Sequence, residues 1–510
     1  MMDLAAFQNN NLFEAGTEFF KQLGIRLNSN TTFSLEAREL LKDQYKDKDI
    51  FEAIKETYFL GLVDDSVFGK HVPLLSEDKI SLKEADEKIN PNYNGLMVFA
   101  VKLPDSFSPT RGGIADLTRA FNRVSKNIPV VLLLQYWGIL SFATSERTRY
   151  KQEYREGEKI GKISLLKDIN IDSPHTGHLR ILYDLKVKPD VTDFNALYKQ
   201  WQEVFNVQLL NKKFYQELAN WYFWAIKTVT FPDDVEKDEG VRNATNVIRL
   251  ITRLIFVWFI KEKGLVSDKL FDPDYLKDIL NYSDKTGSTY YKAILQNLFF
   301  ATLNTDMNKD TPGSRKFVNR QYGIHYFYRY ERFFTDRKKA LELFENIPFL
   351  NGGLFECLDK NVGQDNEIRI DCFSNSPQKA ARLIAPDELF FSREQTIDLN
   401  EIYGTKGKSY KVRGIIDILN SYKFTIAENT PVEEEIALDP ELLGKVFENL
   451  LASYNPETQT TARKQTGSFY TPREIVNYMV DESLIAYLSS KLTGRNSSSP
   501  PFRKGGQGGI

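Results

Sequence analysis

The sequence has few of the residues that build disulfide frameworks or metal sites. Its 510 residues include two cysteines and four histidines. Two thiols in so long a chain are typical of a reduced cytosolic protein rather than of a disulfide scaffold. Cys357 and Cys372 could pair in principle, but we favour two unpaired core residues. We therefore expect a cytoplasmic protein.

An excess of charge of either sign is also missing. Lys and Arg together number 67 and Asp and Glu together number 69, which gives a net charge of −2 and a pI near 6.2. A chain so nearly neutral has no overall attraction for polyanions. Any surface that binds nucleic acid must therefore be local.

Long hydrophobic runs are absent. The most apolar stretch, residues 246–266, contains only seven uninterrupted apolar residues, after Arg249 and Arg253, whereas a membrane-spanning helix needs about 20. Its apolar residues recur at helical spacing, so we expect a buried helix of a soluble domain and no membrane. The opening MMDLAAFQNN lacks a cationic region followed by a long apolar one, so we expect no signal peptide.

The length and composition of the chain are sufficient for several hydrophobic cores. A chain of 510 residues exceeds what one core usually serves. The pattern along the chain predicts an α+β protein with an α/β unit followed by a large, mainly helical region. The expected parts are a mainly helical segment (1–95), the α/β unit (96–190), a helical connector (191–437), helices that lead toward a further domain (438–490) and a low-complexity tail (491–510).

The α/β unit is predicted from apolar runs of different length and period. Residues 96–103, LMVFAVKL, have strand length, and residues 112–126 have helical spacing. Residues 128–144 predict two further strands around a turn at Trp137-Gly138. Strand, helix, strand and strand together indicate an α/β arrangement. Aromatic residues at helical spacing after Asp193 are expected to form the core of the helical region.

A nuclease of the restriction type is one function that such a unit could have. It needs an Asp on one strand and Asp/Glu-x-Lys on the next, so that two carboxylates hold a divalent ion while the lysine polarises water. The strand sequence VVLLLQYWGILSF carries no carboxylate, and Asp86-Glu87-Lys88 lies in a polar run with no apolar strand before it. We therefore expect that the unit does not cleave DNA.

The pair His175 and His178 in the sequence PHTGH suggests a zinc site at first sight. No cysteine or third histidine lies near it in the sequence, although a zinc site takes about four such ligands. A turn histidine that hydrogen-bonds to the backbone is the interpretation that we favour, and we expect no metal.

Residues 466–480, TGSFYTPREIVNYMV, predict a loop that leads directly into the N-terminus of a helix. Gly467 permits an open turn, Thr471 can cap the helix, and Pro472 suits its first turn. A helix N-terminus can receive an anionic group such as a carboxylate. By itself this pattern indicates a well-capped helix and no more.

This stretch resembles the motif that precedes the cofactor domain of N6-adenine DNA methyltransferases. Five other strings resemble, in order, the long N-terminal region of single-chain type IIG restriction-modification enzymes. They are SERTRYKQEYREGEKIGKISLLKDI, PHTGHLRIL, RLIFVWFIKEKGL, IPFLNGGLFE and LDPELLGKVFENLLASY. The resemblance covers residues 95–490 and implies S-adenosylmethionine as cofactor, double-stranded DNA as substrate and adenine N6 as the acceptor of the methyl group. It also implies that the α/β unit is a degenerate relic of a nuclease domain, and that the cofactor is lined by Tyr470, Thr471, Pro472 and Ile475.

The sequence departs from this family after the Thr-Pro motif. An Asp-Pro-x-x-Gly-x-Gly loop for the cofactor and an Asn-Pro-Pro-Tyr that holds the flipped adenine should follow, and neither occurs. Residues 499–502, SPPF, imitate the second motif but lie in a tail rich in Ser, Pro and Gly. We therefore expect the N-terminal portion of such an enzyme, inactive alone and lacking the class I methyltransferase domain, with the separately encoded remainder of the methyltransferase as its partner.

A non-enzymatic DNA-binding or assembly module of a restriction system is the alternative. It would bind DNA with a steep dependence on salt and transfer no methyl group. Two basic stretches could contact phosphates, or they could be ordinary solvated loops. They contain Lys406, Lys408, Lys411 and Arg413 in one loop and Arg463 and Lys464 in another.

Overall fold

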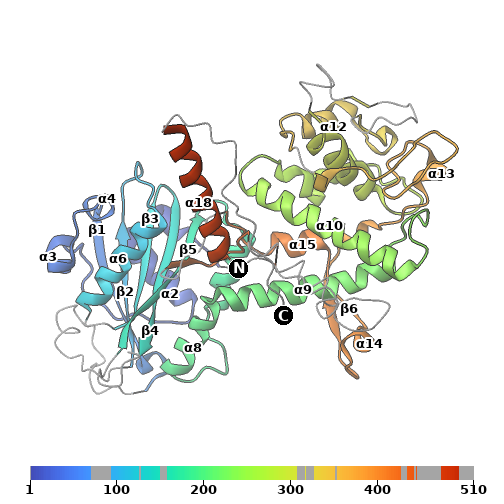
Figure 1. The fold of residues 1–510 in the computed structure, drawn as a ribbon. Helices are drawn as coiled ribbons and strands as arrows, with labels where there is room; N and C mark the ends of the chain where they lie inside the picture. The colour runs from blue at the N-terminus through green and yellow to red at the C-terminus, as the bar shows by residue number, and fades with distance from the viewer. Residues whose placement is uncertain are drawn as a thin grey trace, which may run out of the picture. The chain divides into compact units, whose positions relative to one another are not determined.

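The computed structural model of the chain divides into two compact units, Met1–Leu443 and Gly444–Ile510. The structure describes residues 2–70, 94–125, 128–149, 158–306, 316–317, 327–350, 353–426, 433–440, 444 and 473–492. The first unit contains a six-stranded sheet and a largely helical region (Figure 1). In the second unit the described element is α18 (Arg473–Leu492).

The sheet is mixed. Its strands lie in the order β1 (Glu56–Val63), β2 (Leu96–Lys102), β3 (Val130–Tyr136), β4 (Ile139–Arg149), β5 (Glu158–Asn170) and β8 (Glu433–Glu435). The pairs β2/β3 and β5/β8 are parallel and the other neighbours are antiparallel. β2 and β3 are almost continuous apolar runs because helices cover both faces of the sheet.

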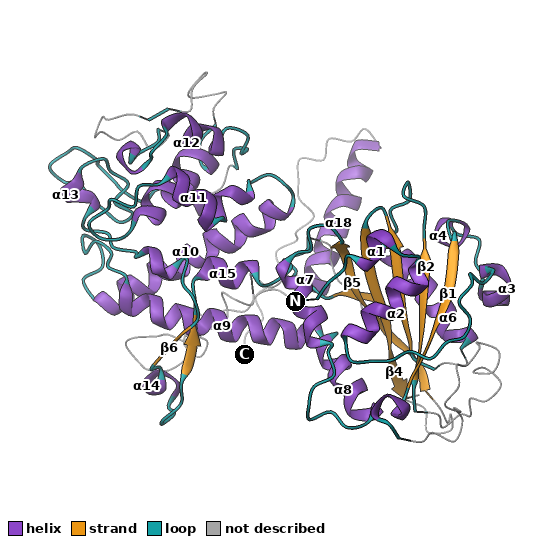
Figure 2. Cartoon of the chain, turned by 180° about the vertical axis from the view of Figure 1, so that it is seen from behind, coloured by secondary structure: helices purple, strands orange, loops and turns teal. Residues whose placement is uncertain are grey.

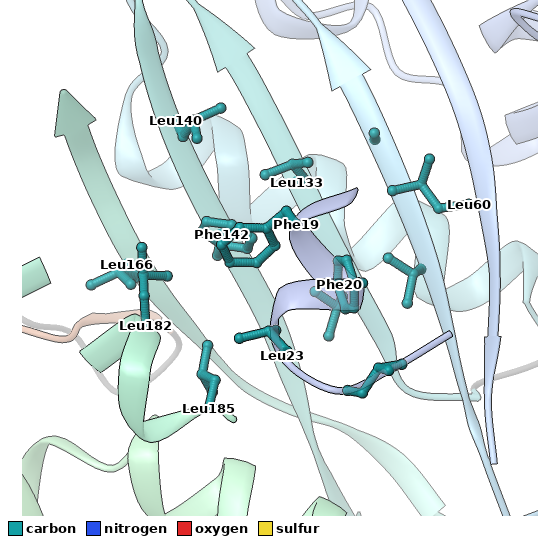
Figure 3. Close-up of a cluster of buried hydrophobic side chains, with 14 of the residues drawn as sticks. Phe19, Phe20, Leu23, Leu60, Leu133, Leu140, Phe142, Leu166, Leu182 and Leu185 are labelled. Atoms are coloured by element: carbon teal, nitrogen blue, oxygen red, sulfur yellow. The ribbon is translucent and has the colours of Figure 1, made fainter. Parts of the chain in front are cut away.

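Each face of the sheet has its own hydrophobic cluster. On one face, β1, β2, β3 and β5 pack against α3 (Ala37–Leu41), α4 (Asp49–Glu52) and α6 (Arg111–Val124). The opposite face is covered by α1 (Ala6–Asn9), α2 (Leu12–Gln22), α7 (Thr176–Asp184) and α8 (Phe194–Val204). Figure 3 shows Phe19, Phe20 and Leu23 of the α2 segment lying over Phe142 and Leu133 of the strands. Figure 2 shows α1 and α2 of this face in front of the strands.

The helical region is built around two long helices, α9 (Val207–Thr228) and α10 (Glu239–Glu262). α10 is long and apolar enough to cross a membrane, but 72% of its most apolar window is buried inside the protein, as in a core helix. A π-helix at Tyr291–Leu303 is buried along its whole length. The other elements are α11 (Pro273–Ile279), α12 (Arg337–Phe344), α13 (Pro377–Ala380), β6 (Gln395–Ile397), α14 (Asn400–Tyr403), β7 (Tyr410–Val412) and α15 (Ile415–Asn420), with short 3₁₀ turns between them.

The predicted mixed α+β fold with a helical region after the sheet is confirmed. The strand, helix, strand and strand expected from residue 96 are β2, α6, β3 and β4, and Trp137 and Gly138 form the left-handed turn between the last two, with φ of 44° and 68°. The sheet is larger than the sequence indicates. β1 lies in the segment expected to be mainly helical, and β8 returns from beyond the helical region to pair with β5.

Candidate functional site

The beginning of β1 and the end of β2 place a carboxylate beside a lysine. Glu56 begins β1 and Lys102 ends β2, and the two residues are partners in the antiparallel register. Lys102 Nζ lies 4.0 Å from Glu56 Oε1. The Tyr58 hydroxyl donates to Glu56 Oε2 over 2.8 Å, and burial together with Glu56 raises the pKa of Tyr58 to about 12. Tyr58 is therefore a stable donor that orients the Glu56 carboxylate.

This arrangement is close to the nuclease pattern but lacks one carboxylate. Two residues before Lys102, where an Asp/Glu-x-Lys motif has its acid, stands Ala100, which is fully buried opposite Tyr58. Side chains alternate along a strand, so Glu56, Ala100 and Lys102 belong to the same face of the sheet. None of the described strands carries Asp/Glu-x-Lys. Among the described residues, the carboxylate found within 4.0 Å of Lys102 Nζ is that of Glu56.

A second polar group lies where β4 and β5 change register. The Tyr136 hydroxyl donates to Asp168 Oδ1 over 2.9 Å and lies 2.8 Å from Ser141 Oγ. Lys167 Nζ lies 2.7 Å from both carboxylate oxygens of Asp168. Asp168 has a φ of 62°, a left-handed conformation that the register shift requires. Burial and the charge of Asp168 raise the pKa of Tyr136, so this hydroxyl stays protonated.

Glu435 of β8 extends this polar group. Its Oε2 accepts from Thr425 Oγ1 over 3.2 Å and lies 4.0 Å from Arg111 Nε. Burial raises the pKa of Glu435, Asp168 raises it further, and Arg111 opposes both effects. In the described part of the chain, no group of three or more His, Cys, Asp or Glu residues could hold a metal ion. Asp168 and Glu435 each have a cation beside them, Lys167 and Arg111. These residues therefore serve best as a structural connection between β8 and the rest of the sheet.

The two histidines are parts of the fold. His175 caps α7, and its Nδ1 accepts from the Gly177 N–H over 3.0 Å, which confirms a turn histidine bonded to the backbone. Burial lowers the pKa of His175 to about 4 and that of His178 to about 3, so both are neutral near pH 7. The cysteines Cys357 and Cys372 are free and buried, as expected.

Most residues of the predicted cofactor loop lie outside the described residues. This holds for Tyr470, Thr471 and Pro472. Ile475 lies near the start of α18 and its side chain is 49% exposed. The role of all four residues in holding a cofactor stays a prediction.

The basic residues of the 406–413 stretch differ in their surroundings. Lys406 and Lys408 are exposed. Lys411 is also exposed, but its Nζ lies 2.7 Å from Glu394 Oε1. Arg463 and Lys464, as well as Asp86-Glu87-Lys88, lie outside the described residues. Contact between these cations and DNA stays a prediction.

Arg413 belongs to a half-buried network around Glu217 of α9. The Glu217 carboxylate accepts from Arg413 Nη2, from Arg180 Nη2 over 3.0 Å and from the Tyr422 hydroxyl over 2.8 Å. Burial opposes ionisation of Glu217, but Arg413 and Arg180 outweigh it and lower its pKa. Since Arg413 also donates to Ser421 Oγ over 2.8 Å, its guanidinium is committed to the fold.

Comparisons with known proteins give one informative similarity. No model of a protein family matches the sequence, and no solved structure matches it. The chain is 29% identical over 487 residues to a protein of Methanocaldococcus jannaschii that is named as a candidate type II restriction enzyme and methyltransferase. The match covers 87% of this chain and 33% of that protein, so the chain spans about a third of its relative. The chain is therefore a distant homologue of one part of a candidate restriction enzyme and methyltransferase.

Proposed function

We propose that the chain is the part of a site-specific restriction-modification DNA methyltransferase that precedes the methyltransferase domain. The complete enzyme would move a methyl group from S-adenosylmethionine to adenine N6 in double-stranded DNA, with the base held out of the stack. The similarity to the M. jannaschii protein over 87% of this chain carries the proposal. The resemblance of six sequence strings in the same order to type IIG enzymes supports it.

The sheet would be a nuclease-type scaffold that no longer cuts DNA. Cleavage needs two carboxylates on a divalent ion and a lysine that is free to polarise water. Ala100 takes the place of one acid, and Lys102 is engaged by Glu56. What remains can hold the strand ends together by an ion pair, but it does not supply the charge that a metal ion needs.

The described residues do not assemble a site for S-adenosylmethionine. Of the four residues that the resemblance assigns to the cofactor, the structure describes Ile475, whose side chain is half exposed. When bound to the complete enzyme, the cofactor supplies the methyl group. Two or three hydrogen bonds from a single loop, at about 1 kcal/mol each, fall short of the roughly 8 kcal/mol that a micromolar site needs.

The test is transfer of tritiated methyl groups to DNA by the purified chain, alone and together with the polypeptide encoded beside it. We expect no transfer by the chain alone and transfer to adenine N6 by the mixture, since the remainder supplies the cofactor and base pockets. Transfer by neither sample would instead favour a non-enzymatic DNA-binding module. If the chain alone bound S-adenosylmethionine with micromolar affinity and Thr471→Ala abolished this binding, the chain would hold a complete cofactor site, contrary to the proposal.

A further inference from the structure

A two-stranded ribbon, β6 and β7, presents a short loop at its end. The strands pair from Gln395 opposite Val412 to Ile397 opposite Tyr410, and α14 and the segment Gly404–Ser409 connect them. Figure 1 shows β6 and α14 extending from the helix α9. We call Gly404–Ser409, with the sequence GTKGKS, the tip loop.

The ribbon is fixed to α9. The Tyr403 hydroxyl donates to Asn220 Oδ1 over 2.9 Å, and Asn220 Nδ2 donates to the Lys411 carbonyl over 3.3 Å. The Tyr403 ring packs edge-on against Phe223 of α9, with centroids 5.5 Å apart, and stacks on Tyr410 at 4.9 Å. α14 and β7 are thus held against α9 before any ligand arrives.

The tip loop is held in one conformation by Asn400. The Asn400 side-chain oxygen accepts from the Lys408 N–H over 3.0 Å and from the Thr405 hydroxyl over 2.8 Å. Its Nδ2 donates to the Lys408 carbonyl over 2.8 Å. A loop that is already ordered loses little entropy when it binds a partner.

Two lysines of the tip loop have no ion-pair partner among the described residues. Lys406 and Lys408 are exposed, and no ion pair is found for either among the described residues. The tip loop contains no acid. By contrast, the nearby Lys411 is paired with Glu394. The two free charges therefore face solvent at the end of a fixed support.

The backbone beside these lysines is open to a ligand. Gly404 and Gly407 adopt left-handed conformations with φ of 60° and 67°, and no atom lies within 4 Å of a Cβ built on either residue. A phosphate can therefore approach the main chain between the two lysines.

We propose that the tip loop contacts the phosphate backbone of double-stranded DNA through Lys406 and Lys408. This inference rests on the proposed function, which makes double-stranded DNA the substrate. A duplex fits better than a single strand because single-strand sites stack bases on exposed aromatic rings. Tyr403 and Tyr410, the aromatic residues of the ribbon, stack on each other and are half-buried. The contact positions the duplex without reading its sequence.

The experiment measures binding of a fluorescent duplex to the full chain over a series of salt concentrations. In the double variant Lys406→Ala/Lys408→Ala, we expect affinity near physiological salt to fall on the order of tenfold. The slope of log affinity against log salt should fall by about 1.8, since each phosphate contact contributes about 0.9. The variant Lys406→Arg/Lys408→Arg should bind like the wild type, because it keeps both charges.

The control is Lys338→Ala/Lys339→Ala, which removes two exposed charges from α12, of which Lys338 lies 3.9 Å from Glu342. It should leave both affinity and slope unchanged. If Lys406→Ala/Lys408→Ala binds like the wild type, or if both alanine variants lose the same affinity, the tip loop does not contact DNA as proposed. Either result leaves the proposed function standing. An effect seen with RNA or anionic vesicles but not with the duplex would overturn the role of the tip loop as well. No binding of the duplex by the wild type would overturn the DNA substrate of the proposed function and this inference with it.

Discussion

At the scale of single residues, the buried carboxylate of Asp359 in the helical region has hydrogen-bond donors at both of its oxygens. Asp359 Oδ1 accepts from the N–H groups of Ile370, Asp371 and Cys372 at 2.8 to 3.1 Å. Its Oδ2 accepts from Phe373 N–H and from Arg369 Nη1 at 3.0 and 2.9 Å. Successive N–H groups that converge on one point form an anion-binding concavity. Here the protein fills that concavity with its own carboxylate.

Asp359→Ala should therefore be among the most destabilising substitutions in the helical region. Four N–H groups and Nη1 of Arg369, a side chain that is almost fully buried, would lose their acceptor, while Arg369 Nε would keep its bond to Glu367. We expect a loss on the order of 3–5 kcal/mol in the free energy of unfolding. Urea denaturation followed by fluorescence measures it, and Asp365→Ala, at an exposed acid nearby, serves as the control. Equal stability of the two variants would show that the bonds to Asp359 contribute little.

Glu217 gives a prediction for the effect of pH. Its pKa is lowered from 4.5 in the folded protein, so the charged network stabilises the fold above the unfolded pKa and stops doing so as the pH falls through the folded pKa. At pH 7, Glu217→Gln should cost about 2 kcal/mol, since two arginines lose their counter-charge. The difference from the wild type should shrink below about pH 4.5. Denaturation curves at several pH values measure this, and a difference that is constant down to pH 3 would contradict it.

Residue types alone predicted some of these roles. The burial of Cys357 and Cys372 and the capping of a turn by His175 follow from composition and local sequence. The pair Glu56 and Lys102 could not be predicted in this way, because it depends on the register of two strands that are far apart in the sequence. The signal that could have found it is Lys102 itself, which ends the apolar run of β2.

At the scale of secondary-structure elements, apolar runs determined most of what could be predicted. β2, α6, β3 and β4 follow from length and periodicity. β8 could not be predicted, because its sequence is three glutamates and its partner β5 precedes the whole helical region. Its place is secured by neighbouring contacts: Lys162 pairs with Glu434, and Ile436 donates its N–H to the Leu165 carbonyl over 2.7 Å and packs in the sheet core.

The attachment of β8 can be tested at Ile436. Its side chain is 1% exposed, so Ile436→Ala should cost on the order of 2–4 kcal/mol. Because the lost contacts join β8 to the sheet, hydrogen exchange in residues 433–440 should accelerate more than in β2 or β3. Ile426→Ala, at a residue 41% exposed, is the matched control. Unchanged exchange in residues 433–440 would mean that other contacts suffice to hold β8.

At the scale of the whole molecule, the sequence predicts a sheet followed by a helical region but not how they are joined. The Glu217 network ties α7, which covers the sheet, to α9 and to Tyr422. β8 brings the end of the helical region back to the edge of the sheet. Both connections join segments that are distant in the sequence, and local patterns carry no information on them. Under the proposed function, these two connections would keep the sheet and the helical region together while the chain binds DNA.

The most direct measurement is incubation of supercoiled plasmid with the purified chain and Mg²⁺ or Mn²⁺, at protein concentrations where the plasmid is bound. We expect the plasmid to stay supercoiled, because Glu56 is the one carboxylate beside Lys102 in the described sheet and Ala100 stands at the position of the second. Nicked or linear product that disappears with Glu56→Ala or Lys102→Ala would contradict the account, since it would show that this incomplete site cleaves. Product that disappears with Asp116→Ala or Glu146→Ala would contradict it too, by revealing a site elsewhere in the α/β unit.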